Sequence, residues 1–122
     1  MDDLYRELIL DHYKHPRNFG NLPRPTCSAK KNNPLCGDEL SVDLNITDGV
    51  IEDIKFSGQG CAISVAAASL LSEHVQHMKI GGLQRLSKDD MVKLLNTPLT
   101  PVRLKCAMLS LEVAQQAAAK IL

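Results

Sequence analysis

The chain has 122 residues, of which 14 are Lys or Arg and 14 are Asp or Glu, so its formal net charge is zero. A chain of this length can bury a core of its own without disulfides, and we expect one domain over residues 1–122. The balanced charge argues against a nucleic-acid partner. No run of about 18 apolar residues occurs, so we expect no membrane span.

The four cysteines of the chain bear on its compartment. The chain begins Met1-Asp2-Asp3, which is acidic and lacks the basic and then apolar pattern of a secretory signal peptide. We therefore expect a cytoplasmic protein, in which cysteines stay reduced and bind metals or take part in chemistry. In a secreted protein the same residues could instead form two disulfides.

The first third of the chain predicts one helix and one edge strand. Asp2 or Asp3 can cap a helix that continues to about Lys14. The proline and glycine of residues 15–20 end this helix. A polar segment follows, with an edge strand expected near residues 26–31.

A β-hairpin is the clearest pattern in the chain. Residues 40–47 alternate apolar and polar side chains, which is typical of a strand with one buried face. Asp48-Gly49 predicts a two-residue turn. A return strand is expected over residues 50–57.

The second half of the chain predicts helices. Apolar residues recur at helical spacing over residues 61–75, and the glycine pair at 81–82 is expected to stop this helix. Ser87 can cap a short helix that ends near Asn96. The last helix has its apolar residues within 104–121. Antiparallel strands followed by helices on one face predict an α+β fold.

Four possible metal ligands lie where a loop meets a regular element: Cys36, Asp38, Cys61 and Cys106. Gly37 lets the backbone turn sharply, so that its two neighbours can face one point. Cys61 follows a Gly-Gln-Gly turn and opens a helix, whose N-terminal partial charge favours thiolate. Cys106 lies in the early turns of the last helix, near two basic residues. We expect these positions to lower thiol pKa values or to expose the thiols.

A shared metal site and scattered core thiols are both open on this evidence, because no Cys-x-x-Cys pair occurs. Three soft sulfurs would suit zinc or an iron-sulfur cluster. The hard carboxylate oxygen of Asp38 could let go of such a metal. A site of this composition would therefore be labile.

Four segments of the chain carry a family pattern: residues 11–18, 32–38, 58–64 and 103–106. Together they extend over nearly the whole chain, and the three cysteine-containing segments occur in order. The chain thereby resembles the NifU N-terminal domain family, which contains the iron-sulfur scaffold IscU and the sulfur-accepting protein SufU. The resemblance implies an α+β fold with a three-stranded antiparallel sheet and helices packed on one face.

The resemblance also implies a function. Cluster or zinc ligands would be Cys36, Cys61 and Cys106, with Asp38 beside them. A cysteine desulfurase would deliver persulfide sulfur to Cys106 or Cys61, and iron would join to form a labile [2Fe-2S] cluster for transfer to apo-proteins. Zinc would occupy the site in the resting protein. Such a protein is a carrier more than an enzyme with a turnover of its own.

Features of both branches of the family occur. Lys105 stands immediately before Cys106, the last of the three family cysteines, as in SufU-type members, whereas IscU-type members have His there. The spacing from Cys61 to Cys106 is short, as in IscU, whereas SufU-type members carry an insertion. Residues 99–103 resemble the chaperone-docking segment of IscU with two changes, which makes an Hsp70-type chaperone a candidate partner. A zinc-dependent sulfurtransferase of the SufU kind is therefore the alternative.

The remaining candidates have plainer interpretations. Cys27 is expected to be an incidental surface or edge thiol. Spacing of three residues could make metal pairs of His12 with His15 and of His74 with His77, but we expect His12 to pack at the edge of the core. A third class of function is a structural zinc module that only docks partners and that would unfold without metal.

Overall fold

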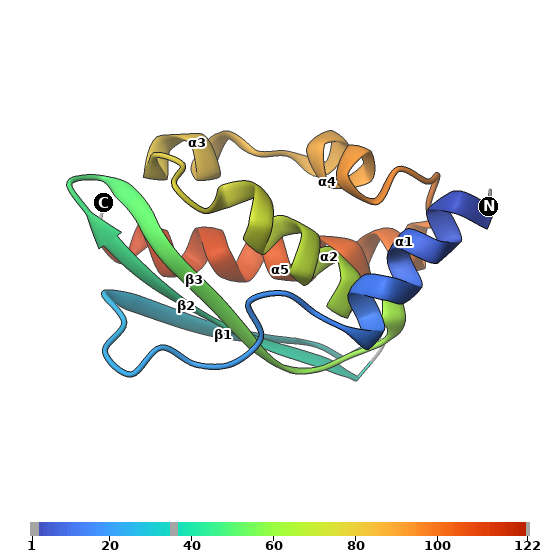
Figure 1. Cartoon of the computed structure of the whole chain (residues 1–122), viewed down its shortest axis with the longest axis horizontal. Coiled ribbons are helices and arrows are strands. Elements are labelled where there is room, and N and C mark those ends of the chain that lie inside the picture. Colours follow the sequence, from blue (N-terminus) through green and yellow to red (C-terminus); the bar gives the residue numbers. More distant parts are fainter. Residues whose placement is uncertain (1–2, 35–36, 122) are drawn as a thin grey trace.

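The structure is a computed structural model that describes residues 3–34 and 37–121. Its elements are α1 (Asp3–Lys14), β1 (Cys27–Asn33), β2 (Asp38–Thr47), β3 (Val50–Gln59), α2 (Ala62–Val75), α3 (Ile80–Arg85), α4 (Lys88–Leu95) and α5 (Pro101–Ala119) (Figure 1). The predicted α+β class with a three-stranded antiparallel sheet is confirmed, since the strands pair in the order β1-β2-β3.

The central strand β2 determines which face of the sheet is buried. Leu40, Val42 and Leu44 are buried, and the polar residues between them are only partly covered. The predicted hairpin turn connects β2 to β3, with Asp48 at φ 51° and Gly49 at φ 77°. Both residues have the positive φ that a tight two-residue hairpin requires.

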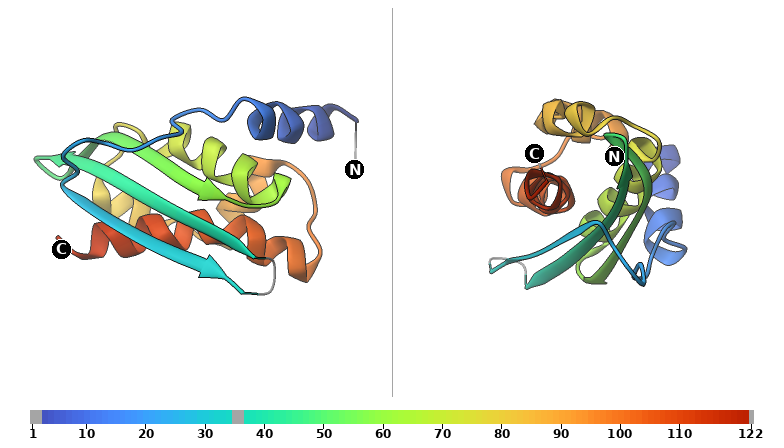
Figure 2. Two further views of the ribbon diagram at one scale, coloured as in Figure 1. Left: turned by 90° about the horizontal axis from the view of Figure 1, so that it is seen from below. Right: turned by 90° about the vertical axis from the view of Figure 1, so that its left-hand side faces the viewer.

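Two helices cover the apolar face of the sheet. α5 packs along β1 and β2, and α2 packs between α5 and α1 (Figure 2). Ala66 and Ala67 of α2 and Ala114 of α5 are fully buried, and side chains this small let the two helices approach closely. α3 and α4 lie outside this pair, and α4 contacts both α2 and α5.

The polar segment before β1 crosses the other face of the sheet. The backbone N–H of Gly20 donates to Phe56 O of β3 at 2.8 Å, and the N–H of Thr26 donates to Leu44 O of β2 at 2.8 Å. Between them, the N–H of Leu22 donates to Asp43 Oδ2 at 3.0 Å. The polar face of the sheet is therefore partly covered by the chain itself.

The predicted end of the helix that starts near residue 61 was wrong. α2 ends at Val75, and the glycine pair at 81–82 lies inside α3. The backbone N–H of His77 donates to Ile51 O at 2.7 Å, and the N–H of Ile51 donates to Met78 O at 2.8 Å. These bonds to the start of β3 replace the bonds that would have continued the helix. Such long-range pairing cannot be seen in helical periodicity.

The starts of α4 and α5 carry the capping residues that the sequence offers there. Ser87 and Asp90 form a reciprocal capping box at the start of α4, with Asp90 Oδ2 accepting the Ser87 N–H at 2.8 Å. α5 begins three residues before the first apolar position of its pattern, because Thr100 is its cap and Pro101 occupies its first turn.

The sequence pattern at residues 11–18 attaches α1 to α2. His12 is buried and its Nδ1 lies 2.7 Å from Ser69 Oγ, which also accepts the backbone N–H of Arg17 at 2.9 Å. The hydroxyl of Ser69 can therefore donate to Nδ1 of a neutral imidazole. His12 is thus occupied at the edge of the core, as expected, rather than exposed for a metal.

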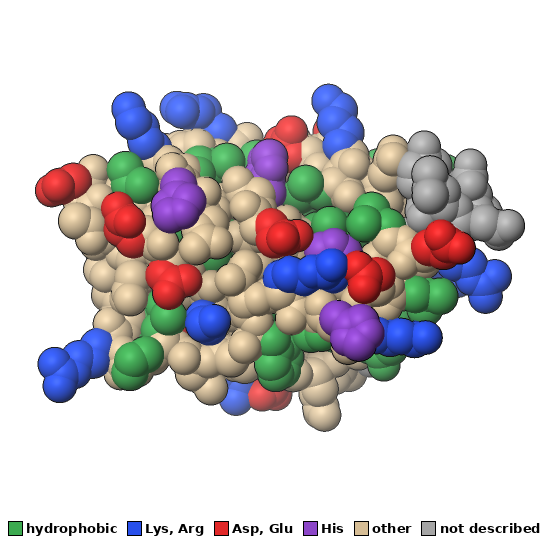
Figure 3. All heavy atoms as spheres, viewed as in Figure 1, with side chains coloured by type: hydrophobic (Ala, Val, Ile, Leu, Met, Phe, Trp, Pro, Cys, Tyr) green, Lys and Arg blue, Asp and Glu red, His purple; other side chains and the backbone are tan. Residues whose placement is uncertain are grey.

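Both signs of charge are interspersed over the face of the molecule drawn in Figure 3. None of the helices in residues 3–34 and 37–121 has the length and apolar character needed to cross a bilayer.

The buried imidazole predicts a pH dependence of stability. Burial holds the pKa of His12 below its ordinary value, Arg17 acts in the same direction, and Glu73 and Asp11 oppose them. The stability contributed by neutral His12 is present above the unfolded-state pKa of about 6.5 and is lost as pH falls through the folded-state pKa. Urea unfolding of the wild type should therefore show a larger loss of unfolding free energy between about pH 7.5 and about pH 5 than His12→Gln.

The matched control for that measurement is His74→Gln, since His74 is exposed on the same helix that receives His12. This control should keep the pH dependence of the wild type. Equal pH dependence in the wild type and in His12→Gln would show that the imidazole is not held neutral by the fold.

Candidate functional site

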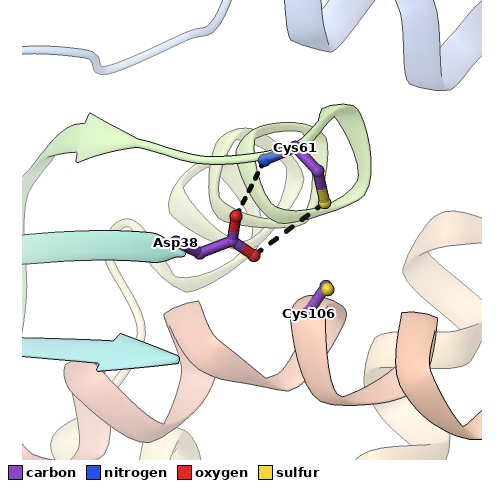
Figure 4. Close-up of side chains that lie close together, drawn as sticks. All are labelled: Asp38, Cys61 and Cys106. Carbon is purple, nitrogen blue, oxygen red and sulfur yellow. Dashed lines mark hydrogen bonds between the residues drawn. The ribbon is translucent and has the colours of Figure 1, made fainter. Parts of the chain in front are cut away.

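The structure brings three of the four predicted ligands together at one end of the sheet. Asp38 begins β2, Cys61 is the N-cap residue of α2, and Cys106 lies in the second turn of α5. Their ligand atoms all lie within 4.8 Å of one another (Figure 4). Cys36, the fourth predicted ligand, lies outside the described residues.

Asp38 is a buried carboxylate whose two oxygens are both hydrogen-bonded. Its side chain belongs to a residue that is only 1 % exposed. Oδ1 accepts the backbone N–H of Cys61 at 3.0 Å, and Oδ2 accepts the hydroxyl of Ser64 in a short hydrogen bond. Because a buried carboxylate without such donors would be strongly destabilising, these bonds determine where the carboxylate points.

Ser64 is a residue of this site that the sequence reasoning missed. Its hydroxyl is fully buried and lies 3.4 Å from Cys61 Sγ as well as beside Asp38. A signal was present, since residues three apart share one face of a helix and Ser64 follows Cys61 at that spacing. Serine in a helix is ordinarily interpreted as packing or solvated surface, which is why the spacing alone did not single it out.

Two glycines permit the close approach of β2, β3 and α2. Gly58 has φ 120°, and a Cβ there would lie 2.1 Å from Glu39 O. At Gly60 a Cβ would lie 2.9 Å from Ser64 Cβ and 3.2 Å from Asp38 Oδ1. Side chains at either position would push apart the elements that carry the ligands. β3 continues to Gln59, two residues beyond its predicted end.

The two described thiols of the site differ in accessibility. Cys61 is exposed, as expected, but Cys106 is only 3 % exposed and the expectation of an exposed thiol there was wrong. Cys106 lies on the face of α5 that also carries buried Leu109 and Val113. The same face that packs into the protein therefore directs this thiol inward, so that of these two described thiols Cys61 is the more accessible to an incoming group.

Cys27 is separate from this site. Cys27 was expected to be a surface or edge thiol. It is the first residue of the edge strand β1, but its side chain is buried in the hydrophobic core rather than on the surface. Burial raises the pKa of its thiol, and Lys120 opposes that shift. A buried thiol with a raised pKa is a poor nucleophile and a poor metal ligand.

The donor set fits a metal with little rearrangement. Two thiolates and one carboxylate offer soft and hard ligands together, which suits zinc or iron. A tetrahedral zinc with bonds of about 2.3 Å to sulfur needs donor atoms roughly 3.8 Å apart. The observed separations of up to 4.8 Å are slightly wider, so small rotations of the side chains would close the site.

The crowding at Gly60 predicts a specific variant. Gly60→Ala should displace the Asp38 carboxylate, weaken the bond from the Cys61 N–H, and speed hydrogen exchange of that amide by about tenfold. The same change should weaken binding of Co²⁺, measured by its absorption spectrum. Gly81→Ala is the matched control, since a Cβ there meets nothing closer than 3.8 Å. Unchanged exchange in Gly60→Ala would show that Asp38 tolerates the added methyl group.

Comparison with known proteins identifies the family of this chain. Residues 4–122 match the model of the NifU-like N terminal domain family. The chain is 34% identical to the zinc-dependent sulfurtransferase SufU of Bacillus subtilis (strain 168), with 98% of this chain and 92% of SufU covered. It is 32% identical to the iron-sulfur cluster assembly scaffold protein IscU of Escherichia coli (strain K12), with 94% of this chain and 91% of IscU covered.

A solved structure shows the same architecture. The crystal structure of the N-terminal part of a nitrogen-fixing NifU-like protein from Brucella abortus superposes with a TM-score of 0.79 at 25% identity, covering 98% of this chain and 95% of that one. The resemblance carried by the cysteine-containing segments is therefore confirmed over nearly the full length of the chain: it belongs to the NifU-like N terminal domain family.

Proposed function

We propose that this protein is an iron-sulfur cluster assembly scaffold. The observation that carries the proposal is the convergence of Asp38, Cys61 and Cys106 within 4.8 Å at one end of the sheet. The same fold and family contain the scaffold protein IscU of E. coli. Cys36 would complete the ligand set, and residues 1–122 would work as a single cytoplasmic domain.

Sulfur would enter through the exposed thiol. A cysteine desulfurase carries its sulfur as a persulfide, whose outer sulfur the Cys61 thiolate attacks. The new persulfide forms on Cys61, and the desulfurase thiolate leaves. Cys106 is the second candidate acceptor, but its burial requires local opening before a partner can reach it.

The assembled cargo would be a [2Fe-2S] cluster held by the cysteines and passed on to apo-proteins. Asp38 would supply the exchangeable ligand, because a carboxylate oxygen matches a soft iron-sulfur centre less well than a thiolate does. The Cys61 N–H and the Ser64 hydroxyl already hold that carboxylate when it points into the site. A bound metal would share the electron density of the carboxylate with these donors, which weakens the oxygen–metal bond and favours release.

A zinc-dependent sulfurtransferase of the SufU kind is the second candidate. The 34% identity to B. subtilis SufU and the presence of Lys105 before Cys106 support it. The alignment with SufU, however, extends over 137 positions, more than the 122 residues of this chain, so SufU has residues that this chain lacks. The alignment with IscU extends over 119 positions and needs fewer such gaps.

An Hsp70-type chaperone is a further candidate partner. The segment at residues 99–103 includes the cap and first turn of α5, and Val102 is 59% exposed there. Binding of this segment in an extended form would unwind the start of α5. Because Cys106 follows one turn later, chaperone binding and cluster retention would be coupled.

The proposal is tested by anaerobic reconstitution with iron, cysteine and a cysteine desulfurase. The wild type should develop a visible charge-transfer spectrum with about two irons per protein. Cys36→Ser, Cys61→Ser and Cys106→Ser should each lose most of the bound iron after desalting. Cys27→Ser is the matched control and should retain it, because Cys27 pairs with Leu44, six residues along β2 from Asp38. Equal losses in all four variants, or tight zinc that blocks cluster formation in the wild type, would contradict the scaffold function.

Asp38→Ala separates the two candidate functions. In a scaffold, this change should lengthen the half-life of the cluster and slow its transfer to an apo-acceptor by about tenfold, because the exchangeable ligand is gone. In a zinc-dependent sulfurtransferase, it should instead weaken zinc binding and reduce stimulation of the desulfurase. The half-life of the cluster, its transfer rate, the zinc affinity and the stimulation of the desulfurase are measured for the variant and the wild type. A variant that matches the wild type in all four measurements would show that Asp38 has no part in either activity.

A further inference from the structure

A cavity of about 650 Å³ opens directly onto the two described thiols of the site. It lies between α1, the start of α2 and the start of α5. We call it the thiol pocket and define it by Arg6, Ile9, Leu10, Cys61, Arg103 and Cys106. Its volume falls in the range of about 300–1,000 Å³ that is typical of sites for small molecules.

The charged lining of the thiol pocket is entirely basic. Arg6 and Arg103 approach it from different helices, and no carboxylate lines it among the described residues. Neither arginine forms an ion pair with another residue in the described part of the chain. By contrast, Lys30 and Lys31 near the same end of the sheet are each paired with a glutamate at 2.7 Å.

These two guanidinium groups favour a ligand that carries carboxylates. A guanidinium presents a planar fork of N–H donors that matches a carboxylate with two parallel hydrogen bonds. Two such groups beside apolar Ile9 and Leu10 suit a small molecule with more than one carboxylate and a short hydrocarbon body.

The position of Cys61 and Cys106 indicates which chemical group the other end of the ligand carries. A molecule held by Arg6 and Arg103 extends toward Cys61 and Cys106, which lie within 4.8 Å of Asp38 in the site of the proposed function. A sulfur at that point can replace the Asp38 oxygen on a soft metal centre, because thiolate is the softer donor. The thiol proton passes to solvent as the sulfur–metal bond forms and the oxygen–metal bond breaks.

We propose that the thiol pocket binds a low-molecular-mass thiol that carries carboxylates, held by Arg6 and Arg103, and that its sulfur displaces Asp38 from the bound metal. The second part rests on the proposed function, whereas binding to the arginines does not. The ligand gives a cluster scaffold an exit route that needs no protein acceptor.

The test uses mercaptosuccinate as the probe, because it combines one thiol with two carboxylates. Amide chemical shifts of the reduced, metal-free protein are followed during titration with mercaptosuccinate, with succinate, and with 2-mercaptoethanol. Saturable shifts at Ala62, Ile63 and Arg103 are expected with mercaptosuccinate and succinate but not with 2-mercaptoethanol. Arg6→Gln and Arg103→Gln should each raise the dissociation constant about tenfold, as loss of a charge-assisted hydrogen bond predicts.

Arg85→Gln is the matched control variant, since Arg85 is exposed on α3 and does not line the cavity. It should bind the probe with the affinity of the wild type. Equal dissociation constants in all three arginine variants, or binding of 2-mercaptoethanol as tight as that of mercaptosuccinate, would overturn the proposal. So would the absence of binding by any free thiol when a cysteine desulfurase shifts the same amides, because the pocket would then be a protein docking surface.

A second arm tests the sulfur with Co²⁺-loaded protein. Mercaptosuccinate should strengthen the sulfur-to-cobalt charge-transfer band, and succinate should leave it unchanged. An unchanged band with both ligands would overturn the displacement of Asp38. Wild-type reconstitution of a cluster serves as the separate check on the scaffold function. Normal reconstitution without probe binding rejects only the thiol pocket, and arginine-dependent binding without reconstitution rejects only the scaffold.

Discussion

The buried carboxylate of Asp38 is the constraint on which the site depends. It accepts hydrogen bonds from the Cys61 N–H and the Ser64 hydroxyl, and so joins the start of β2 to the first turn of α2. A carboxylate that is 1 % exposed cannot give up these donors without a large loss of free energy, so the junction keeps one geometry. That geometry places Cys61 at the end of the helix and leaves the carboxylate facing Cys106 from α5. A polar contact inside the fold thus positions two possible ligands from distant parts of the chain.

The site combines an accessible thiol with a protected one. Cys61 is exposed at the N-cap of α2, while Cys106 is held inward on the packed face of α5. A scaffold needs both properties, because cargo has to enter and then has to stay. The glycines at 58 and 60 make this possible, since a Cβ at 58 would collide with the backbone of β2 and a Cβ at 60 would collide with Ser64 of α2 and with Asp38. Tight local packing therefore holds the ligand residues of a site that is expected to release its metal.

The N-terminal helix connects the structural pattern at residues 11–18 with the surroundings of the site. His12 and Arg17 attach α1 to Ser69 of α2, and the same helix supplies Ile9, Leu10 and Arg6 to the cavity beside the thiols. Any change in the packing of α1 on α2 would alter the access to Cys61. The imidazole of His12 is buried and hydrogen-bonded through Nδ1 to Ser69, so its role in this arrangement is to hold α1 against α2.

Local pattern determined much of the architecture. The alternation over residues 40–47, the Asp48-Gly49 turn and the Ser87 cap depend on neighbours within a few positions, and the structure has each of them. The cysteine-containing segments were sufficient to indicate the family. Only the tertiary structure decided that α2 ends at Val75, that Cys106 is buried and that Ser64 holds Asp38. It also decided that two arginines from different helices line the cavity beside the thiols. Each of these outcomes depends on contacts between segments far apart in the chain. Packing and hydrogen bonding across the whole fold determine these contacts, and such contacts produce no periodic pattern of residues in the sequence.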